Sequence, residues 1–295
     1  MATFFNNSTV AASNSTDALF RAWVGFIDAA LTGGGWVNTA DTGQMTIATA
    51  LHPTVANTDV GFRIYRMADT LQATKPIYLK IGYGATSVAN VPRLNISAGT
   101  GTDGAGNLTG VLFTGFQPAC NTNTVTIANN YASSDTNRLQ LLMFIRTGVN
   151  DVMALSIERT KDATGADTGD GLLITWGNAG QIVFTSYINT TPGAQPPVEL
   201  GVTTVLSNQT GATSFSGDVG VGVPLHFKSI IQQPGLGMVV VNSADFVAQA
   251  TVSFTFYSAT HTFQLGDSAT SQIGMATGNN TFASRPTTRI GIRFE

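Results

Sequence analysis

"PIYLKIGYG", residues 76–84, carries the alternation that decides the fold. Every second side chain is apolar: Ile77, Leu79, Ile81 and Tyr83. Tyr78, Lys80 and glycines fill the positions between them. A β-strand turns successive side chains to opposite faces, so a period of two is typical of a strand that buries one face. This stretch therefore predicts a half-buried strand.

Runs of the same kind recur along the rest of the chain. In residues 61–67, Phe62 and Ile64 alternate with Arg63 and Tyr65. Further runs occupy residues 138–148, 152–160, 171–177, 181–188, 224–230, 250–258 and 288–294. Clusters of Gly, Pro, Asn, Asp or Thr bound each run, and no helical pattern separates them. This organisation predicts a mainly β protein with antiparallel sheets in a β-sandwich or barrel-like arrangement.

One amphipathic α-helix is predicted near the N-terminus, in "STDALFRAWVGFIDAALTGGG" at residues 15–35. Ser15 or Thr16 suits the N-cap, and Asp17 places a negative charge in the first turn, where the helix dipole favours it. Apolar residues then follow at helical spacing, and the glycines at 33–35 end the run.

The apolar face of this helix contains the residues that we select as interface candidates: Phe20, Trp23, Phe26 and Ile27. The face is broad, so it either packs on a sheet of its own chain or docks onto a neighbouring subunit. The second alternative predicts a homo-oligomer, for which we favour a trimer.

The predicted domain organisation has an N-terminal arm and helix at 1–35, a first β lobe at 36–190 and a second at 191–295. The stretch "NTTPGAQPPVELG" at 189–201 is rich in Pro and Gly and marks the boundary between the lobes. The two lobes could also form one continuous domain.

Composition excludes several classes of protein. Charged residues make up only 11% of the 295, the net charge is −3, and the 14 Lys and Arg are scattered. A nucleic-acid binder needs a basic stripe, so no nucleic-acid partner is expected. No apolar run reaches the length of a membrane span, so no membrane insertion is expected either.

Motifs for catalysis, cofactors or metals are lacking, so we expect no enzyme activity, cofactor or bound metal. Cys120 is the only cysteine, the three His are far apart in sequence, and Glu is rare. Asp162, Asp167 and Asp170 lie among glycines and could bind calcium, but their spacing does not match an EF-hand loop. Asp and Gly are also typical of hairpin turns, which we favour here.

The glycine-rich stretch "GTGTDGAGNLTG" at 99–110 raises the question of a phosphate-binding loop. Such a loop needs a helix directly after its glycines, and the residues that follow show no helical spacing. We therefore predict a hairpin or surface loop in which Asp103-Gly104 and Gly106-Asn107 supply the positive-φ positions of tight turns.

Four phrases together resemble virion structural proteins of tailed bacteriophages. They are "TADTGQM" at 39–45, "DTLQATKPIYLKIGYG" at 69–84, "GTGTDGAGNLTG" at 99–110 and "SIERTKDATGADTGDG" at 156–171. The resemblance spans residues 36–177 and continues towards the end of the chain. It carries no catalytic motif.

The resemblance implies a non-enzymatic structural component of the virion, assembled in the cytoplasm of the bacterial host with other virion proteins as partners. It favours the tail, baseplate or fibre assembly, with a head decoration or head-fibre protein as the alternative. Low charge suits such a role, because uncharged polar surfaces cost less to bury at an interface. A receptor- or glycan-binding module is the third hypothesis, and an exposed aromatic side chain beside amide side chains would distinguish it.

Overall fold

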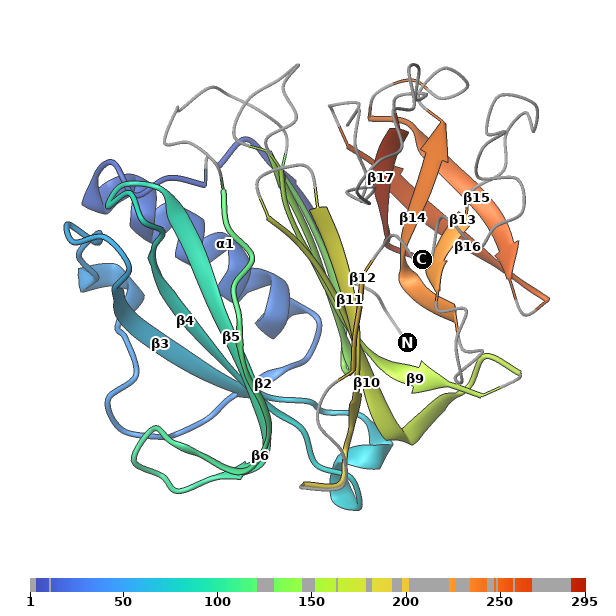
Figure 1. The fold of residues 1–295 in the computed structure, drawn as a ribbon, viewed down its shortest axis with the longest axis horizontal. Coiled ribbons are helices and arrows are strands. Elements are labelled where there is room, and N and C mark those ends of the chain that lie inside the picture. The colour runs from blue at the N-terminus through green and yellow to red at the C-terminus, as the bar shows by residue number, and fades with distance from the viewer. Residues whose placement is uncertain are drawn as a thin grey trace, which may run out of the picture.

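The computed structural model describes residues 4–10, 12–120, 130–144, 152–162, 164–178, 182–192, 198–201, 223–226, 234–242, 247, 249–256, 258–266 and 288–295. Within these residues, one α-helix and three antiparallel β-sheets form the fold, as the sequence predicts. Figure 1 shows the three sheets as successive layers, with the helix beside the first.

The N-terminal sheet has the strand order β2-β3-β4-β5-β6. Its strands are β2 (Val37–Asn38), β3 (Asp59–Arg66), β4 (Tyr78–Ala85), β5 (Pro92–Thr102) and β6 (Leu108–Phe116). Two short 3₁₀ helices, η1 (Ile47–Thr49) and η2 (Thr70–Ala73), lie in its connections.

The central sheet has seven strands in the order β1-β7-β8-β9-β10-β11-β12. They are β1 (Phe4–Ser8), β7 (Asn130–Asp135), β8 (Arg138–Phe144), β9 (Val152–Lys161), β10 (Asp167–Asn178), β11 (Ile182–Asn189) and β12 (Val198–Gly201). All three predicted segments, 1–35, 36–190 and 191–295, thus contribute strands to this sheet, so those ranges do not coincide with sheet boundaries.

The C-terminal sheet has the order β13-β14-β17-β16-β15. Its strands are β13 (Val223–His226), β14 (Pro234–Asn242), β15 (Thr251–Phe256), β16 (Ala259–Leu265) and β17 (Thr288–Arg293). Strands β14 and β17 pack on the face of the central sheet that points away from the helix (Figure 1).

Helix α1 (Asp17–Gly33) begins and ends where its sequence predicts. The Thr16 hydroxyl caps it by accepting a hydrogen bond from the Leu19 N–H at 3.2 Å. At the other end the Gly34 N–H donates to the Ala30 carbonyl, and Gly35 adopts a φ of +100°. A side chain on Gly34 would collide with the Ser134 Oγ, so glycine also lets the helix end approach β7 closely.

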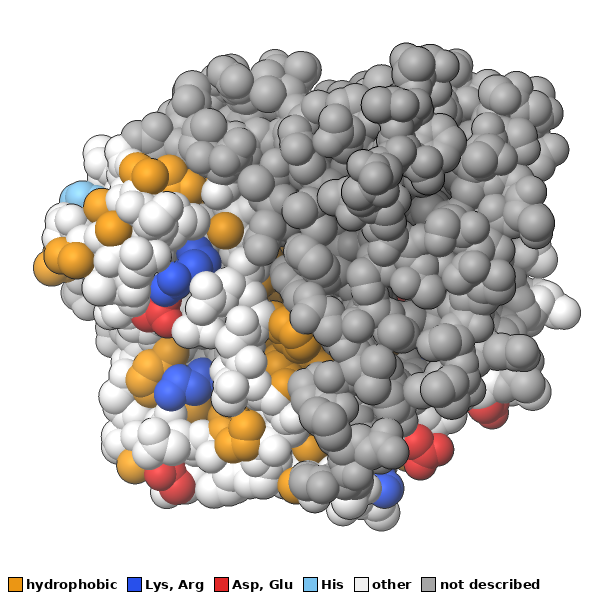
Figure 2. Space-filling view, in the orientation of Figure 1, with side chains coloured by type: hydrophobic (Ala, Val, Ile, Leu, Met, Phe, Trp, Pro, Cys, Tyr) orange, Lys and Arg blue, Asp and Glu red, His pale blue; other side chains and the backbone are white. Residues whose placement is uncertain are grey.

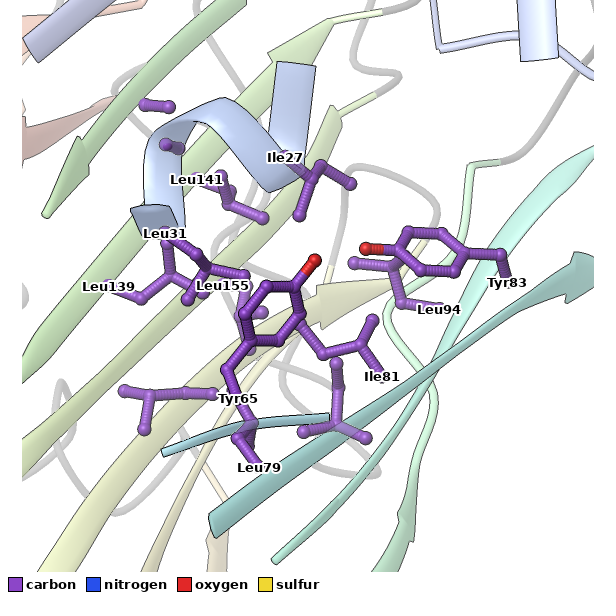
Figure 3. Packing of buried hydrophobic residues seen from close by; sticks show 14 of the residues in the cluster. Ile27, Leu31, Tyr65, Leu79, Ile81, Tyr83, Leu94, Leu139, Leu141 and Leu155 are labelled. Atoms are coloured by element: carbon purple, nitrogen blue, oxygen red, sulfur yellow. The ribbon is translucent and has the colours of Figure 1, made fainter. Parts of the chain in front are cut away.

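The main hydrophobic core lies between the N-terminal and central sheets, with the helix embedded in it. Side chains of α1, of β3–β5 and of β8–β9 point toward one another there (Figure 3). The helix contributes Phe20, Trp23, Val24, Phe26, Ile27, Ala30 and Leu31, each no more than 4% exposed. Fully burying one such large side chain stabilises the fold by about 1.5–3 kcal/mol, so the helix is central to stability.

Strand β3 turns Arg63 and Tyr65 toward the helix, although Ile64 on its other face is fully buried as well. Arg63 pairs with Ile81 and Tyr65 with Leu79, and both partners point into the core. The Tyr65 hydroxyl donates to the Asp28 carboxylate of the helix at 2.6 Å, and Arg63 Nε lies 3.1 Å from the same carboxylate. Phe62 therefore points to the outer face. The alternation alone does not show which face meets the helix, because Tyr and Arg bury an apolar stem and carry a polar end that finds a partner.

A buried ion pair also joins the N-terminal and central sheets. Arg159 of β9 binds the Asp69 carboxylate through Nε at 2.5 Å and Nη2 at 3.0 Å, and both side chains are buried. Arg159 Nη2 also donates to the Lys75 carbonyl at 3.0 Å. These paired hydrogen bonds compensate the cost of burying the charges and fix the position of the β3–β4 connection on β9.

Placing a charge at Trp23 tests whether the helix belongs to the core. Trp23→Asp is expected to lower the free energy of unfolding by about 4 kcal/mol or more, because it removes a fully buried ring and buries an unpaired carboxylate. Chemical denaturation followed by circular dichroism measures the change. Ala22→Asp adds the same charge on the exposed face of the helix and should have a small effect; equal losses from both variants would contradict this arrangement.

Candidate functional site

The interface candidates Phe20, Trp23, Phe26 and Ile27 lie inside the core of their own chain. Trp23 packs against Phe20 and edge-on against Tyr83, with ring centroids 6.0 and 5.8 Å apart. In this fold they are not accessible to a neighbouring subunit. Of the two alternatives for the helix face, packing within the chain is the one that the structure shows, and any contact with another subunit needs a different surface.

A groove opens on the outer face of the N-terminal sheet, opposite the helix. Its volume is about 630 Å³, within the usual range of small-molecule sites. Its polar lining comes from Asp59, Lys80, Asn95, Ser97, Asn107 and Thr114. Its apolar lining comes from Val60, Phe62, Leu108 and Val111. We call this site the outer groove; Figure 2 shows charged and hydrophobic side chains close together over this part of the molecule.

A carboxylate that crosses a strand fixes one side of the outer groove. Asp59 of β3 accepts hydrogen bonds from Arg93 Nη2 and Asn95 Nδ2 of β5, each at 2.8 Å. Strand β4 runs between them, with Gly84 in register with both Asp59 and Arg93. A Cβ on Gly84 would collide with the Asp59 carboxylate and with the Thr58 carbonyl. Glycine is therefore required for the carboxylate to lie across the strand.

The opposite side of the outer groove is built around the β5–β6 turn. The Lys80 ammonium lies 3.9 Å from the centroid of the Phe62 ring, a cation–π contact, and donates to the Gly106 carbonyl at 2.6 Å. The Gly106 N–H donates to the Asp41 carboxylate at 3.3 Å. Gly106 thus binds Lys80 through its carbonyl and Asp41 through its N–H.

The glycine-rich stretch at 99–110 forms the hairpin predicted for it, although its strands extend further into the stretch than expected. Strands β5 and β6 include residues 99–102 and 108–110, so only 103–107 form the turn. The Asp103 carboxylate accepts from the N–H groups of Ala105 and Asn107, and Gly104 and Gly106 have φ of +76° and +90°. The N–H groups of this turn therefore bind an aspartate of the chain itself.

The acidic stretch at 162–170 belongs to the hairpin of β9 and β10, and its Asp167 and Asp170 already lie in β10. The Asp162 carboxylate accepts from the N–H groups of Thr164 and Ala166 at 2.8 and 3.0 Å. Asp167 pairs with Lys161 and accepts from Asn137 Nδ2. The carboxylates of Asp162 and Asp167 thus bind different groups of the chain instead of converging on one point. Among the residues that the structure describes, no three His, Cys, Asp or Glu side chains lie close enough together to hold a metal ion.

The second face of the central sheet is polar and lies beneath the C-terminal sheet. Ser133, Arg138, Gln140, Ser156 and Glu158 are all buried there. The Gly237 N–H of β14 donates to Glu158 Oε1 at 2.8 Å, and Arg138 Nη2 lies 3.2 Å from Asp135 Oδ2. Burial and the nearby Arg138 charge lower the pKa of Arg293 on β17 to about 10. Buried charges and hydrogen bonds thus lie at this interface together with apolar contacts such as that between Phe5 and Phe294, whose ring centroids are 4.7 Å apart.

The sequence motifs did not point to the outer groove. Its residues come from β3, β4, β5 and β6, and the Asp59–Arg93 pair joins positions 34 residues apart. One signal was present: Lys80, Gly82 and Gly84 share one face of β4. Glycine inside a strand often marks a place where another group approaches the backbone closely.

No helix in the described part of the chain is long and apolar enough to cross a membrane. Comparison with protein-family models, curated proteins and solved structures finds no match for the chain. The function is therefore argued from its own residues.

Substituting glycines tests the strand-crossing carboxylate. Gly84→Ala is expected to lower the free energy of unfolding by about 1–3 kcal/mol, because the new methyl group collides with Asp59 and the Thr58 carbonyl. Gly25→Ala in α1 is the matched control. Its new methyl group would meet no atom within 4 Å beyond the helix backbone and the adjoining residues, so it should stabilise by about 0.5–1 kcal/mol. Urea denaturation measures both, and a stabilising Gly84→Ala would contradict the geometry.

Acid should destabilise the two hairpin turns. Hydrogen bonds from Asn107 lower the pKa of Asp103, and those from Thr164 lower the pKa of Asp162. A lowered native pKa means that the stabilisation is complete above the unfolded pKa of about 3.9 and is lost as pH falls through the native pKa. Thermal melts should therefore be unchanged from pH 7 to 5 and fall below about pH 4. The double variant Asp103→Asn, Asp162→Asn should show a shallower acid dependence; an identical slope would exclude these carboxylates as the cause.

Proposed function

We propose that the chain is a non-enzymatic structural component of a tailed-phage particle and that it acts through protein–protein contacts. The resemblance of its four phrases to virion structural proteins supports this role. So does its composition, because a chain in which only 11% of the residues are charged has few charges to desolvate when its surface is buried against another protein. The tail, baseplate or fibre assembly is the favoured position, and the head is the alternative.

An exposed aliphatic surface at one end of the N-terminal sheet carries the proposal. Leu51, Val55 and Val88 are 67, 60 and 52% exposed. We call these three residues the aliphatic rim. They lie in the two loops that adjoin the start of β3 and the end of β4, which are neighbours in an antiparallel pair. Three exposed aliphatic side chains on two adjoining loops support a protein-contact surface at this end of the sheet.

Hydrogen bonds hold the two loops of the aliphatic rim together. The Asn57 N–H donates to the Thr86 carbonyl at 2.7 Å, and the Thr58 hydroxyl donates to the Val55 carbonyl at 2.6 Å. The Val91 N–H closes the second loop on the Val88 carbonyl at 3.0 Å. A contact surface fixed in advance loses little conformational entropy on binding, which favours assembly. A second copy of the chain is the occupant that we propose, in a symmetric oligomer such as a trimer.

The oligomeric state and the content of the particle test this function. The wild-type chain is expected to sediment as an oligomer at micromolar concentration, and antibodies against it should label purified particles of its phage. The double variant Leu51→Asp, Val55→Asp should raise the dissociation constant of the oligomer about tenfold or more, because the new charges would be buried at the interface. More of the protein should then sediment as monomer. Circular dichroism should stay unchanged.

Thr70→Asp is the matched control, since it adds a charge at an exposed position of η2 outside the aliphatic rim. It should leave the oligomer intact. A monomeric wild-type chain that is also absent from purified particles would refute the proposal. An oligomer that resists the rim variants would place the subunit contact on another surface.

A further inference from the structure

We infer that the outer groove binds a neutral oligosaccharide. This inference goes beyond the structural role proposed above and does not depend on it. It rests on the chemistry of the groove lining, on the way its side chains are fixed in place, and on the backbone of the strands beneath it.

The first argument is the supply of fixed hydrogen-bond acceptors. Asn95 uses its amide N–H group to bind Asp59, so its Oδ1 is left to accept from a ligand. Asp59 receives one hydrogen bond on each carboxylate oxygen and keeps further lone pairs for hydroxyl donors. Because Arg93 and Asn95 already hold the Asp59 carboxylate in place, this side chain would lose little conformational entropy when a ligand binds.

The second argument is a donor on the facing side of the outer groove. Lys80 is held by the Gly106 carbonyl and by the Phe62 ring, and no carboxylate lies within ion-pair distance among the described residues. An ammonium group has three donors, so it can still donate to ligand oxygens. Acceptors on one side and donors on the other match hydroxyl groups, which donate and accept at once.

The third argument is the apolar surface between these polar groups. Val60, Leu108 and Val111 line the outer groove beside Phe62, and two of them are about half exposed: Val60 at 43% and Val111 at 45%. A sugar ring presents C–H groups as well as hydroxyls, so it can cover aliphatic and aromatic side chains while its hydroxyls reach Asp59, Asn95 or Lys80.

The charges of the outer groove favour a neutral ligand. Its lining holds one acidic side chain, Asp59, which pairs with Arg93 at 2.8 Å, and one basic side chain, Lys80. The lining therefore presents no net charge of either sign to an ionic ligand. An anionic ligand would meet Asp59, and a cationic one would meet Lys80 and Arg93.

The backbone of the strands beneath the outer groove disfavours an extended peptide. A peptide that binds a sheet usually adds to an edge strand, where main-chain N–H and C=O groups are free. Strands β4 and β5 have a paired strand on both sides, so their main-chain groups are largely used within the sheet, whose edge on this side is β6. A ligand that lies over β4 and β5 is therefore recognised by side chains, as a saccharide is.

Saturation-transfer NMR with the full chain tests the inference, using maltohexaose, cellohexaose, chitohexaose and mannohexaose as probes. At least one is expected to receive saturation from the protein, and calorimetry with that probe should give a measurable dissociation constant. Thr114→Trp fills the outer groove from exposed β6 and should weaken binding about tenfold or more. Asn95→Ala removes the fixed acceptor, leaves the Asp59–Arg93 pair and should also weaken binding.

Thr70→Trp is the matched control, because it adds the same ring at an exposed position that does not line the outer groove. It should bind as the wild type does, and circular dichroism should show all three variants folded. The inference is overturned if none of the four hexasaccharides binds, or if Thr114→Trp binds as tightly as Thr70→Trp. Binding of a neutral Thr-Asn-Ser-Gly peptide in place of every sugar would also overturn it. None of these results bears on whether the chain belongs to a particle.

Discussion

The rest of the structure depends on one helix held between two sheets. Seven side chains of α1 are buried there, and neither sheet could move away without exposing them. The constraint acts at short range as well, since Gly34 brings the end of the helix against Ser134 of β7. Asp28 binds Tyr65 and Arg63 of β3, so the same helix also fixes the N-terminal sheet through polar contacts. The inner face of the N-terminal sheet is therefore buried against the helix, and its outer face is the one that can contact ligands or partners.

The sequence was a good guide wherever local physics decides the structure. Thr16 and Gly34–Gly35 bound the helix because capping is settled within a few residues. The strand at 76–84 was predicted because its alternation is regular. Which face of β3 meets the helix could not be predicted in this way, since the inward position of Tyr65 depends on Asp28, 37 residues away. The outer groove could not be predicted for the same reason: Asp59 meets Arg93 and Asn95 only once β3, β4 and β5 are in register.

The two faces of the central sheet show how differently a buried surface can be stabilised. The face toward the helix is apolar, with Leu139, Leu141 and Leu155 in the main core (Figure 3). The other face buries Arg138, Gln140 and Glu158 beneath the C-terminal sheet. Apolar contacts tolerate small shifts, whereas a buried charge needs its partner at a fixed distance and angle. The Gly237 N–H of β14, which binds Glu158, is one such directional contact between the two sheets.

These constraints determine which described surfaces remain free to act. The helix face is closed off by the core, and the N-terminal sheet is fixed from within by α1 and at its η2 connection by the Arg159–Asp69 pair. A sheet held in this way presents its outer side chains in one arrangement, which favours recognition by shape and hydrogen-bond geometry. The aliphatic rim lies at one end of this sheet and the outer groove lies on its outer face. Because they are separate, a subunit could use the rim for assembly while the groove stays open to a small ligand.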